Sequence, residues 1–284
     1  MASFYPSAAV AGRPLKTLLQ QYDLENLPLD RAVLAIAEPH CEELDPERVL
    51  RHMNLLARKV RDLVGTGRSE DCLLQGLIKV LFEECGFRGN RSDYYNPENS
   101  FLNRVLETRK GIPISLSLLM IEVGRRLGIR LVGIGLPCHF IVGFPTGSGM
   151  RYFDPYQRGR EKSLTECVEY VSRLAGGSVE IGPQHFLPVS RRLFLSRMLV
   201  NLRCIYRYRQ EAGHLVGVLR QLALLNPGDP IVHVELASLL ADLGNPWEAH
   251  HHFTTFLKLV PESESCRRVQ AHIQEIGKKL AILN

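Results

Sequence analysis

The chain has 284 residues, of which 45% are hydrophobic and 23% charged, with a formal net charge of +5. That composition is typical of a globular protein with one large core or two ordinary ones. No segment approaches the roughly 18 apolar residues of a membrane span, and residues 1–16 lack the apolar region of a signal peptide, so we expect a cytoplasmic protein without membrane attachment. The charge is too small to predict a nucleic-acid partner. Seven scattered cysteines without a C-x-x-C pair argue against a disulfide framework and a zinc site.

The first part of the chain is predicted to be helical. Weaker helical patterns cover residues 14–21 and 29–37. A stronger one begins where Asp45 supplies an N-cap and Pro46 occupies the first helical position, and its apolar stripe continues toward Gly65. The stripe of this core-facing helix consists of Val49, Met53, Leu56, Val60 and Leu63.

A second capped helix and a polar loop follow. Ser69 is the N-cap of a helix that ends at Gly86. A loop rich in turn-forming residues then leads to a short helix at 101–109, for which Asn99 or Ser100 is a natural N-cap.

The middle of the chain changes its hydrophobic period. A helix is predicted over 115–127, followed by short β-branched and aromatic segments at 130–136, 139–144 and 150–153. Pro and Gly separate these segments, and residues 145–149 are predicted to form a hairpin loop. We therefore expect a small antiparallel sheet packed against helices.

The last hundred residues are again helical and contain an internal repeat. Pro227 and Pro261 are 34 residues apart, and each ends a predicted helix pair. This period and its packing residues resemble a tetratricopeptide (TPR) unit, with a degenerate first copy at about 194–227 and a capping helix at 264–282. The packing residues are Ala237, Leu240, Gly244, Trp247, Ala249 and Phe256.

A basic stretch lies at the start of this region. Residues 191–209 contain six arginines and no acid. On a helix, Arg192, Arg203 and Arg207 group opposite an apolar stripe, which favours a solvated face; an acidic protein partner is the alternative.

Four motifs carry a resemblance to a known family. They are Gly111-x-Pro113-x-Ser115, Leu127-Gly128-Ile129, Gly135-Leu136-Pro137-x-His139-Phe140 and Phe153-Asp154-Pro155. Together they resemble the transglutaminase-like superfamily and, with the helical N-terminal region and TPR-like tail, the bacterial SirB-type proteins. The resemblance implies a papain-like site in which His139 is the base and Asp154 orients it.

The nucleophile of such a site is the residue that departs from the pattern. In the superfamily's enzymes a Cys occupies the first turn of the core helix, and here that position, fifteen residues before Gly128, is Pro113. Ser115 is the nearest substitute, although N-capping or local backbone hydrogen bonding also explains it. Cys72 and Cys85 are weaker candidates, on another helix.

Sheet geometry predicts whether His139 and Asp154 meet. They face each other across a hairpin if residue 143 lies opposite residue 150, which requires an even number of loop residues or a bulge. We expect a hydrogen bond between the two side chains. A reactive pair and a buried His that stabilises the hairpin both predict it.

The sequence thus predicts an α+β protein with a transglutaminase-like (papain-like) core, a small antiparallel sheet and a helical N-terminal region over residues 1–188. A TPR-like helical domain is predicted over 189–284. The first functional hypothesis is a non-catalytic interaction or regulatory protein that binds a polypeptide through its core groove or its tail. The alternative is a Ser- or Cys-dependent hydrolase or acyltransferase with Ser115, His139 and Asp154 as its catalytic residues. No cofactor or metal is predicted, because consecutive histidines at 250–252 point in different directions on a helix.

Overall fold

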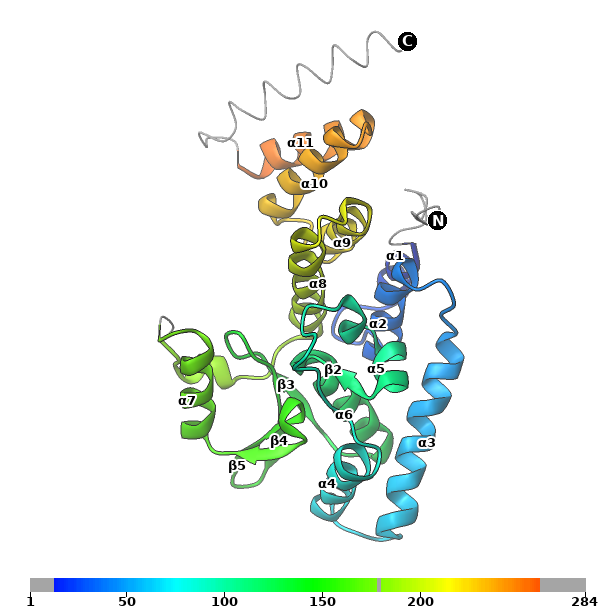
Figure 1. The fold of residues 1–284 in the computed structure, drawn as a ribbon, viewed down its shortest axis with the longest axis vertical. Helices are drawn as coiled ribbons and strands as arrows, with labels where there is room; N and C mark the ends of the chain where they lie inside the picture. The colour runs from blue at the N-terminus through cyan, green and yellow to red at the C-terminus, as the bar shows by residue number, and fades with distance from the viewer. Residues whose placement is uncertain (1–12, 178–179, 261–284) are drawn as a thin grey trace. The chain divides into compact units, whose positions relative to one another are not determined.

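The computed structural model describes residues 13–177 and 180–260 and has two compact units, which divide between Met198 and Leu199. One unit contains mixed helices and a small sheet, and the other, which also takes in the chain up to Thr17, is helical where it is described (Figure 1). Among the described residues, no helix is both long and apolar enough to cross a membrane.

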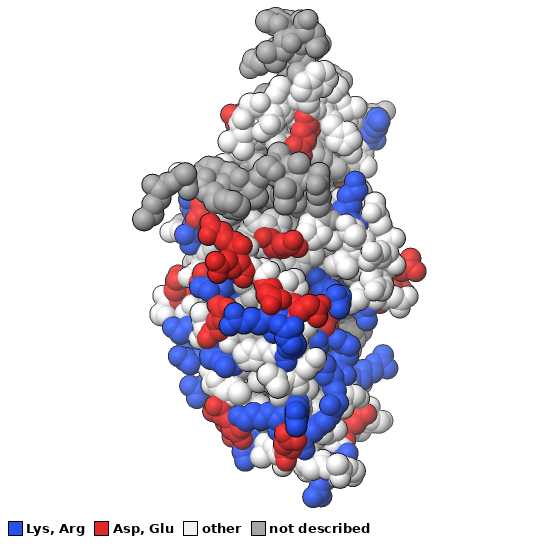
Figure 2. All heavy atoms as spheres, turned by 90° about the vertical axis from the view of Figure 1, so that its right-hand side faces the viewer, with Lys and Arg blue, Asp and Glu red and all other residues white. Residues whose placement is uncertain are grey.

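The predicted N-terminal helices are confirmed as α1 (Arg13–Gln21), α2 (Leu29–Ala37) and α3 (Pro46–Val64). Helix α3 begins as its cap predicts, since the Asp45 carboxylate accepts a hydrogen bond from the Arg48 amide at 3.0 Å. The stripe is buried from Val49 to Val60, but Leu63, assigned to it from spacing, is exposed. On the side of the molecule that carries α3, acidic and basic side chains are interspersed (Figure 2).

Helix α4 (Glu70–Ile78) starts at the predicted cap, where the Ser69 hydroxyl accepts from the Cys72 amide at 3.3 Å. It continues as a π-helical segment, η2 (Lys79–Glu84), which the sequence pattern did not predict. Two-residue strands β1 (Arg88–Gly89) and β2 (Lys110–Gly111) then pair in parallel. Between them lie η3 (Pro97–Ser100) and α5 (Leu102–Thr108).

The predicted cap of α5 is wrong. The N-cap position is Phe101, which provides no side-chain acceptor. Asn99 is buried and turns back into the preceding loop, where its amide donates to the carbonyls of Asp93 at 2.6 Å and Tyr94 at 3.2 Å. Asn99 therefore braces the loop before the core helix instead of capping α5.

Helix α6 (Pro113–Leu127) is the central helix of the mixed unit. Residues 113–120 are all buried, because α6 packs against α3 and α4 and against strands β3 and β4 (Figure 1). A charged cluster ties it to α2: Arg126 contacts Asp30 at 2.6 Å and Glu122 at 2.9 Å. Burial, together with the charge of Asp30, raises the pKa of Glu122.

The sheet is a four-stranded antiparallel meander with the strand order β3-β4-β5-β6. Its strands are β3 (Val132–Ile134), β4 (Ile141–Thr146), β5 (Gly149–Asp154) and β6 (Arg160–Lys162). The hairpin between β4 and β5 is tighter than predicted, since Thr146 pairs with Gly149 and only two residues turn the chain. The 3-10 turn η4 (Pro155–Gln157) connects β5 to β6, and α7 (Leu164–Leu174) and η5 (Pro183–Phe186) follow.

The remaining described helices are α8 (Arg191–Tyr208), α9 (Ala212–Leu225), α10 (Pro230–Asp242) and α11 (Pro246–Leu259). Helix α11 begins and ends 34 residues after α9 does. The last residues of α8 and α10, Tyr208 and Asp242, are also 34 residues apart. The turn residues match too, because Gln210 and Gly244 both have positive φ, 57° and 77°. The capping helix predicted at 264–282 lies outside the described residues.

The arginines of α8 form only part of the solvated face that their spacing favours: Arg192 and Arg207 are exposed, whereas Arg203 is partly buried. Arg203 and Arg207 both form ion pairs with Glu235 of α10. In the same unit His252 Nδ1 lies 2.9 Å from His233 Nδ1, and burial with the charge of His233 lowers the pKa of His252 to about 4.

The two turn positions give a stability test. Gly244→Ala should lower the free energy of unfolding by about 1 kcal/mol, because a Cβ disfavours positive φ, and Gln210→Gly should raise it by a few tenths. Chemical denaturation measures both. Gly228→Ala is the control, because its φ is not positive and no atom lies within 4 Å of an added Cβ. A loss at Gly228 equal to that at Gly244 would contradict the assignment of strain to the turn.

Candidate functional site

The N-terminus of α6 is built by backbone hydrogen bonds that consume the Ser115 hydroxyl. Ser115 Oγ donates to the Asn99 carbonyl at 2.6 Å and accepts from the Ile112 amide at 3.1 Å, and the residue is fully buried. Gly111 is required beside it, since a Cβ there would lie 2.8 Å from that oxygen. Pro113 occupies the first helical position, where an N–H would lack a helical partner in any case.

His139 is held by its backbone at the entrance to β4. The chain turns through Cys138, whose φ is 54°, and the His139 amide donates to the Leu136 carbonyl at 3.3 Å. Arg197 fastens this turn, because its Nη2 donates to the carbonyls of Leu136 at 2.7 Å and His139 at 2.9 Å. Burial lowers the pKa of Arg197. The sequence pattern does not predict this role, because Arg197 is one of several arginines in the basic stretch of residues 191–209.

Asp154 ends β5 and uses both carboxylate oxygens. Oδ2 lies 3.0 Å from His139 Nε2, and Oδ1 accepts from the backbone amides of Tyr156 at 3.0 Å and Gln157 at 3.2 Å. Both side chains are 2% exposed, so water does not compete for these bonds. A carboxylate can only accept, so Nε2 carries the proton, and in the neutral ring Nδ1 keeps the free lone pair. The arrangement orients an imidazole as a base.

The predicted hydrogen bond is therefore present, although the predicted register is wrong by two residues. Gly143 lies opposite Tyr152, not residue 150, so His139 and Asp154 meet diagonally. The turn still holds an even number of residues, and the two side chains remain on one face of the sheet because side chains alternate with a period of two. Cys138 is exposed.

Aromatic rings and one thiol surround the pair. The rings of Tyr170 and Tyr156 stand edge-on to His139, with centroids 4.9 and 6.3 Å away. Cys167 is buried nearby, and burial with the negative charge of Asp154 raises the pKa of its thiol to about 11. It is therefore protonated at neutral pH and a poor nucleophile.

The structure brings His139 and Asp154 together but not Ser115. Among the described residues, no hydrogen bond links Ser115 to His139, and the nearest helical alternative, Ser117, donates at 3.5 Å to the Phe140 carbonyl. No group of three or more His, Cys, Asp or Glu side chains within residues 13–177 and 180–260 is placed to hold a metal ion.

Comparison of the sequence with known proteins relates this chain to a family. Residues 47–200 match the pattern of the Transglutaminase-like superfamily. A UPF0162 protein of Xylella fastidiosa is 32% identical over 276 residues, covering 94% of this chain and 96% of that protein. One from Vibrio cholerae is 28% identical over 72% of this chain and 73% of its own length. Human F-box only protein 21 is 36% identical over 107 residues, which are 35% of this chain and 17% of that protein.

Two substitutions of Asp154 separate its contacts. Asp154→Ala should lower the free energy of unfolding by about 3 kcal/mol, because it leaves a buried imidazole N–H and two backbone amides without an acceptor. Asp154→Asn keeps one oxygen for the amides and should lose about half as much. Urea denaturation measures the difference.

The tautomer of His139 gives an independent readout. In Asp154→Asn the side-chain amide becomes a donor to Nε2, so ¹⁵N NMR should show the proton moved to Nδ1. Equal stability losses in both variants with an unchanged tautomer would contradict the assigned hydrogen bonds.

Proposed function

The chain belongs to the transglutaminase-like superfamily and to the UPF0162 proteins within it, and from that premise we propose that it is a non-catalytic protein-interaction or regulatory module. The finer part of the proposal is a SirB-type protein of the cytoplasm, whose core groove or TPR-like tail binds a polypeptide. The six described cysteines are all free, which fits a reducing compartment.

One observation carries the proposal: the N-terminus of α6, where the enzymes of the superfamily have their nucleophile, has no nucleophilic side chain available. Pro113 has neither a reactive side chain nor an N–H with which to stabilise an oxyanion. Ser115 is two residues further along, and its proton is already donated to the Asn99 carbonyl. To attack a substrate, this hydroxyl would have to leave a fully buried position and break the hydrogen bonds that start α6.

The His139–Asp154 pair then has a structural use. It joins the entrance of β4 to the end of β5, and the remaining carboxylate oxygen holds the η4 turn. A buried, satisfied polar cluster of this kind stabilises one arrangement of the surrounding chain. The proposal is that the superfamily's base pair is retained here for its architecture.

The tail supports the binding half of the proposal. The recurrence of helix ends at 34 residues is the period of a TPR unit, and such repeats present surfaces to polypeptides. At the α10–α11 turn, Trp247 is 67% and Leu243 48% exposed. Exposed aromatic residues of this size are frequent anchors of protein interfaces.

Covalent probes test the absence of catalysis. Fluorophosphonate and iodoacetamide probes should leave Ser115 unlabelled, and any labelling of cysteines should be the same in wild type, His139→Ala and His139→Gln. Mass spectrometry of the labelled peptides gives the site. His139-dependent labelling of Ser115 or of a cysteine would overturn the proposal in favour of a hydrolase or acyltransferase.

Substitution in the full-length chain tests the binding surface. Trp247→Ala should remove the partners that the wild-type protein captures, because truncation of an aromatic anchor costs about 2 kcal/mol or more of binding free energy. Leu55→Ala is the matched control, since Leu55 is 62% exposed on α3. Equal capture by both variants would argue against the tail as the binding surface.

A further inference from the structure

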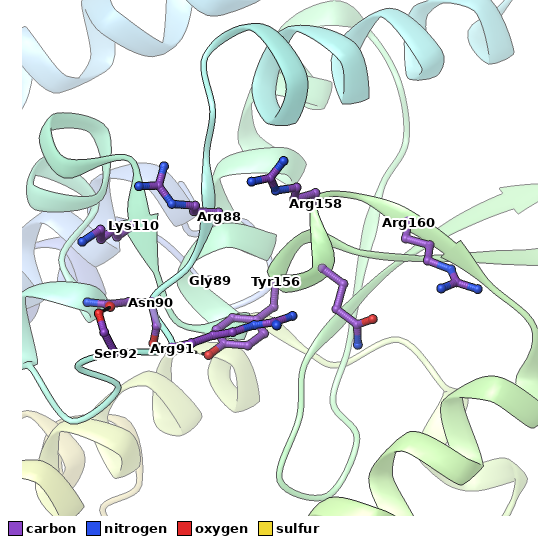
Figure 3. A pocket seen from close by; sticks show the side chains of 10 residues that line it. Arg88, Gly89, Asn90, Arg91, Ser92, Lys110, Tyr156, Arg158 and Arg160 are labelled. Carbon is purple, nitrogen blue, oxygen red and sulfur yellow. Dashed lines mark hydrogen bonds between the residues drawn. The ribbon is translucent and has the colours of Figure 1, made fainter.

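A basic pocket is lined in part by the η4 turn, whose amides donate to Asp154. It has a volume of about 640 Å³ and is lined by β1 and the residues after it, by β2, and by the segment from η4 to β6 (Figure 3). Five of its lining side chains are cationic and none is acidic: Arg88, Arg91, Lys110, Arg158 and Arg160. The volume lies within the range of small-molecule sites, about 300–1,000 Å³.

These cations are largely without counterions inside the chain. Arg160 pairs with Glu166 at 3.0 Å. The other four form no ion pair with any residue in the described parts of the chain, and Arg88 donates only to the Gly86 carbonyl, at 3.2 Å. Like charges that line one cavity repel each other, and a cavity lined by one sign of charge concentrates ions of the opposite sign. The pocket is therefore suited to an anion.

The walls of the pocket are fixed before any ligand arrives. The Tyr156 ring packs so closely on Gly89 that a Cβ there would lie 2.4 Å from it, and the Tyr156 hydroxyl donates to the Asn90 carbonyl at 3.3 Å. These contacts join η4 to β1. Arg158 has a φ of 58°, an uncommon conformation for a residue with a side chain, at the end of the turn that Asp154 caps.

The charge and the lining identify the chemical class of the anion. Four unpaired cations exceed the charge of a single phosphate and match that of a diphosphate or triphosphate. Three of them are arginines, whose forked donors fit phosphate oxygens. The only aromatic side chain in the lining is Tyr156, and its ring packs against Gly89, so the pocket offers no apolar anchor of the kind that peptide ligands require.

We propose that this pocket binds the di- or triphosphate group of a small phosphorylated ligand, next to the His139–Asp154 pair and distinct from the Trp247 surface proposed for polypeptide binding. The ligand is held through its charge: Arg88 and Lys110 approach from the paired strands β1 and β2, Arg91 from the loop after β1, and Arg158 from the turn after β5 (Figure 3). Binding should weaken steeply as salt is added, because its contacts are charge pairs near the surface.

Calorimetric titration of the full-length protein with sodium pyrophosphate, ATP and inorganic phosphate tests this assignment. Pyrophosphate and ATP should bind and inorganic phosphate should bind at least tenfold more weakly. Arg88→Gln and Arg158→Gln should each weaken pyrophosphate binding about tenfold, the equivalent of about 1.4 kcal/mol. Both side chains are exposed, so the fold should be retained, and thermal unfolding checks it.

Arg58→Gln is the matched control, since it removes the same charge from the exposed face of α3, outside the pocket. It should change the affinity less than twofold. ATP binding more tightly than pyrophosphate at the same arginines would identify a nucleotide as the source of the polyphosphate, and equal affinities would identify the polyphosphate group itself. Equal weakening by Arg58→Gln, no binding of pyrophosphate, or tighter binding of a poly-glutamate peptide at these arginines would each overturn the proposal.

Discussion

The Asp154 carboxylate is the interaction on which the mixed unit depends. One oxygen binds the His139 ring, and the other binds two backbone amides of η4. A buried carboxylate is stable only when its oxygens accept hydrogen bonds. The hydrogen bonds of Asp154 join three segments that are separate in the sequence: the entrance to β4, the end of β5 and the turn to β6. The tautomer of His139 and the path of the chain after β5 are therefore set by the same side chain.

The start of α6 is under a second constraint, because the first eight residues of this helix are buried. A buried helix start must satisfy its first amides without water, and Pro113 removes one of them while Ser115 takes a backbone amide and a carbonyl. The groups that satisfy the buried start of α6 are therefore engaged with the backbone. The His139–Asp154 pair and this helix start are thus compatible in one stable core.

Local signals explain what could be predicted from the sequence. Asp45 and Ser69 predicted helix starts because caps act within one turn, and side-chain alternation placed His139 and Asp154 on one face. The failures required information from distant segments. Leu63 follows the stripe by its spacing, but its side chain is exposed, and Asn99 donates to carbonyls in its own loop. The residues that line the basic pocket come from three separate stretches of the chain, so no continuous run of charged residues predicts it.

The same turn that satisfies Asp154 also forms a wall of the basic pocket. Tyr156 and Gln157 give their amides to the carboxylate while their side chains line the cavity, and Arg158 follows directly. An anion bound at Arg158 would act on the turn whose amides donate to one oxygen of Asp154, while the other oxygen lies 3.0 Å from His139 Nε2. The η4 turn joins the carboxylate to the pocket, and any coupling between binding in the pocket and the arrangement of the pair would be reciprocal in free energy. That connection would give the His139–Asp154 pair a consequence beyond the hairpin it stabilises.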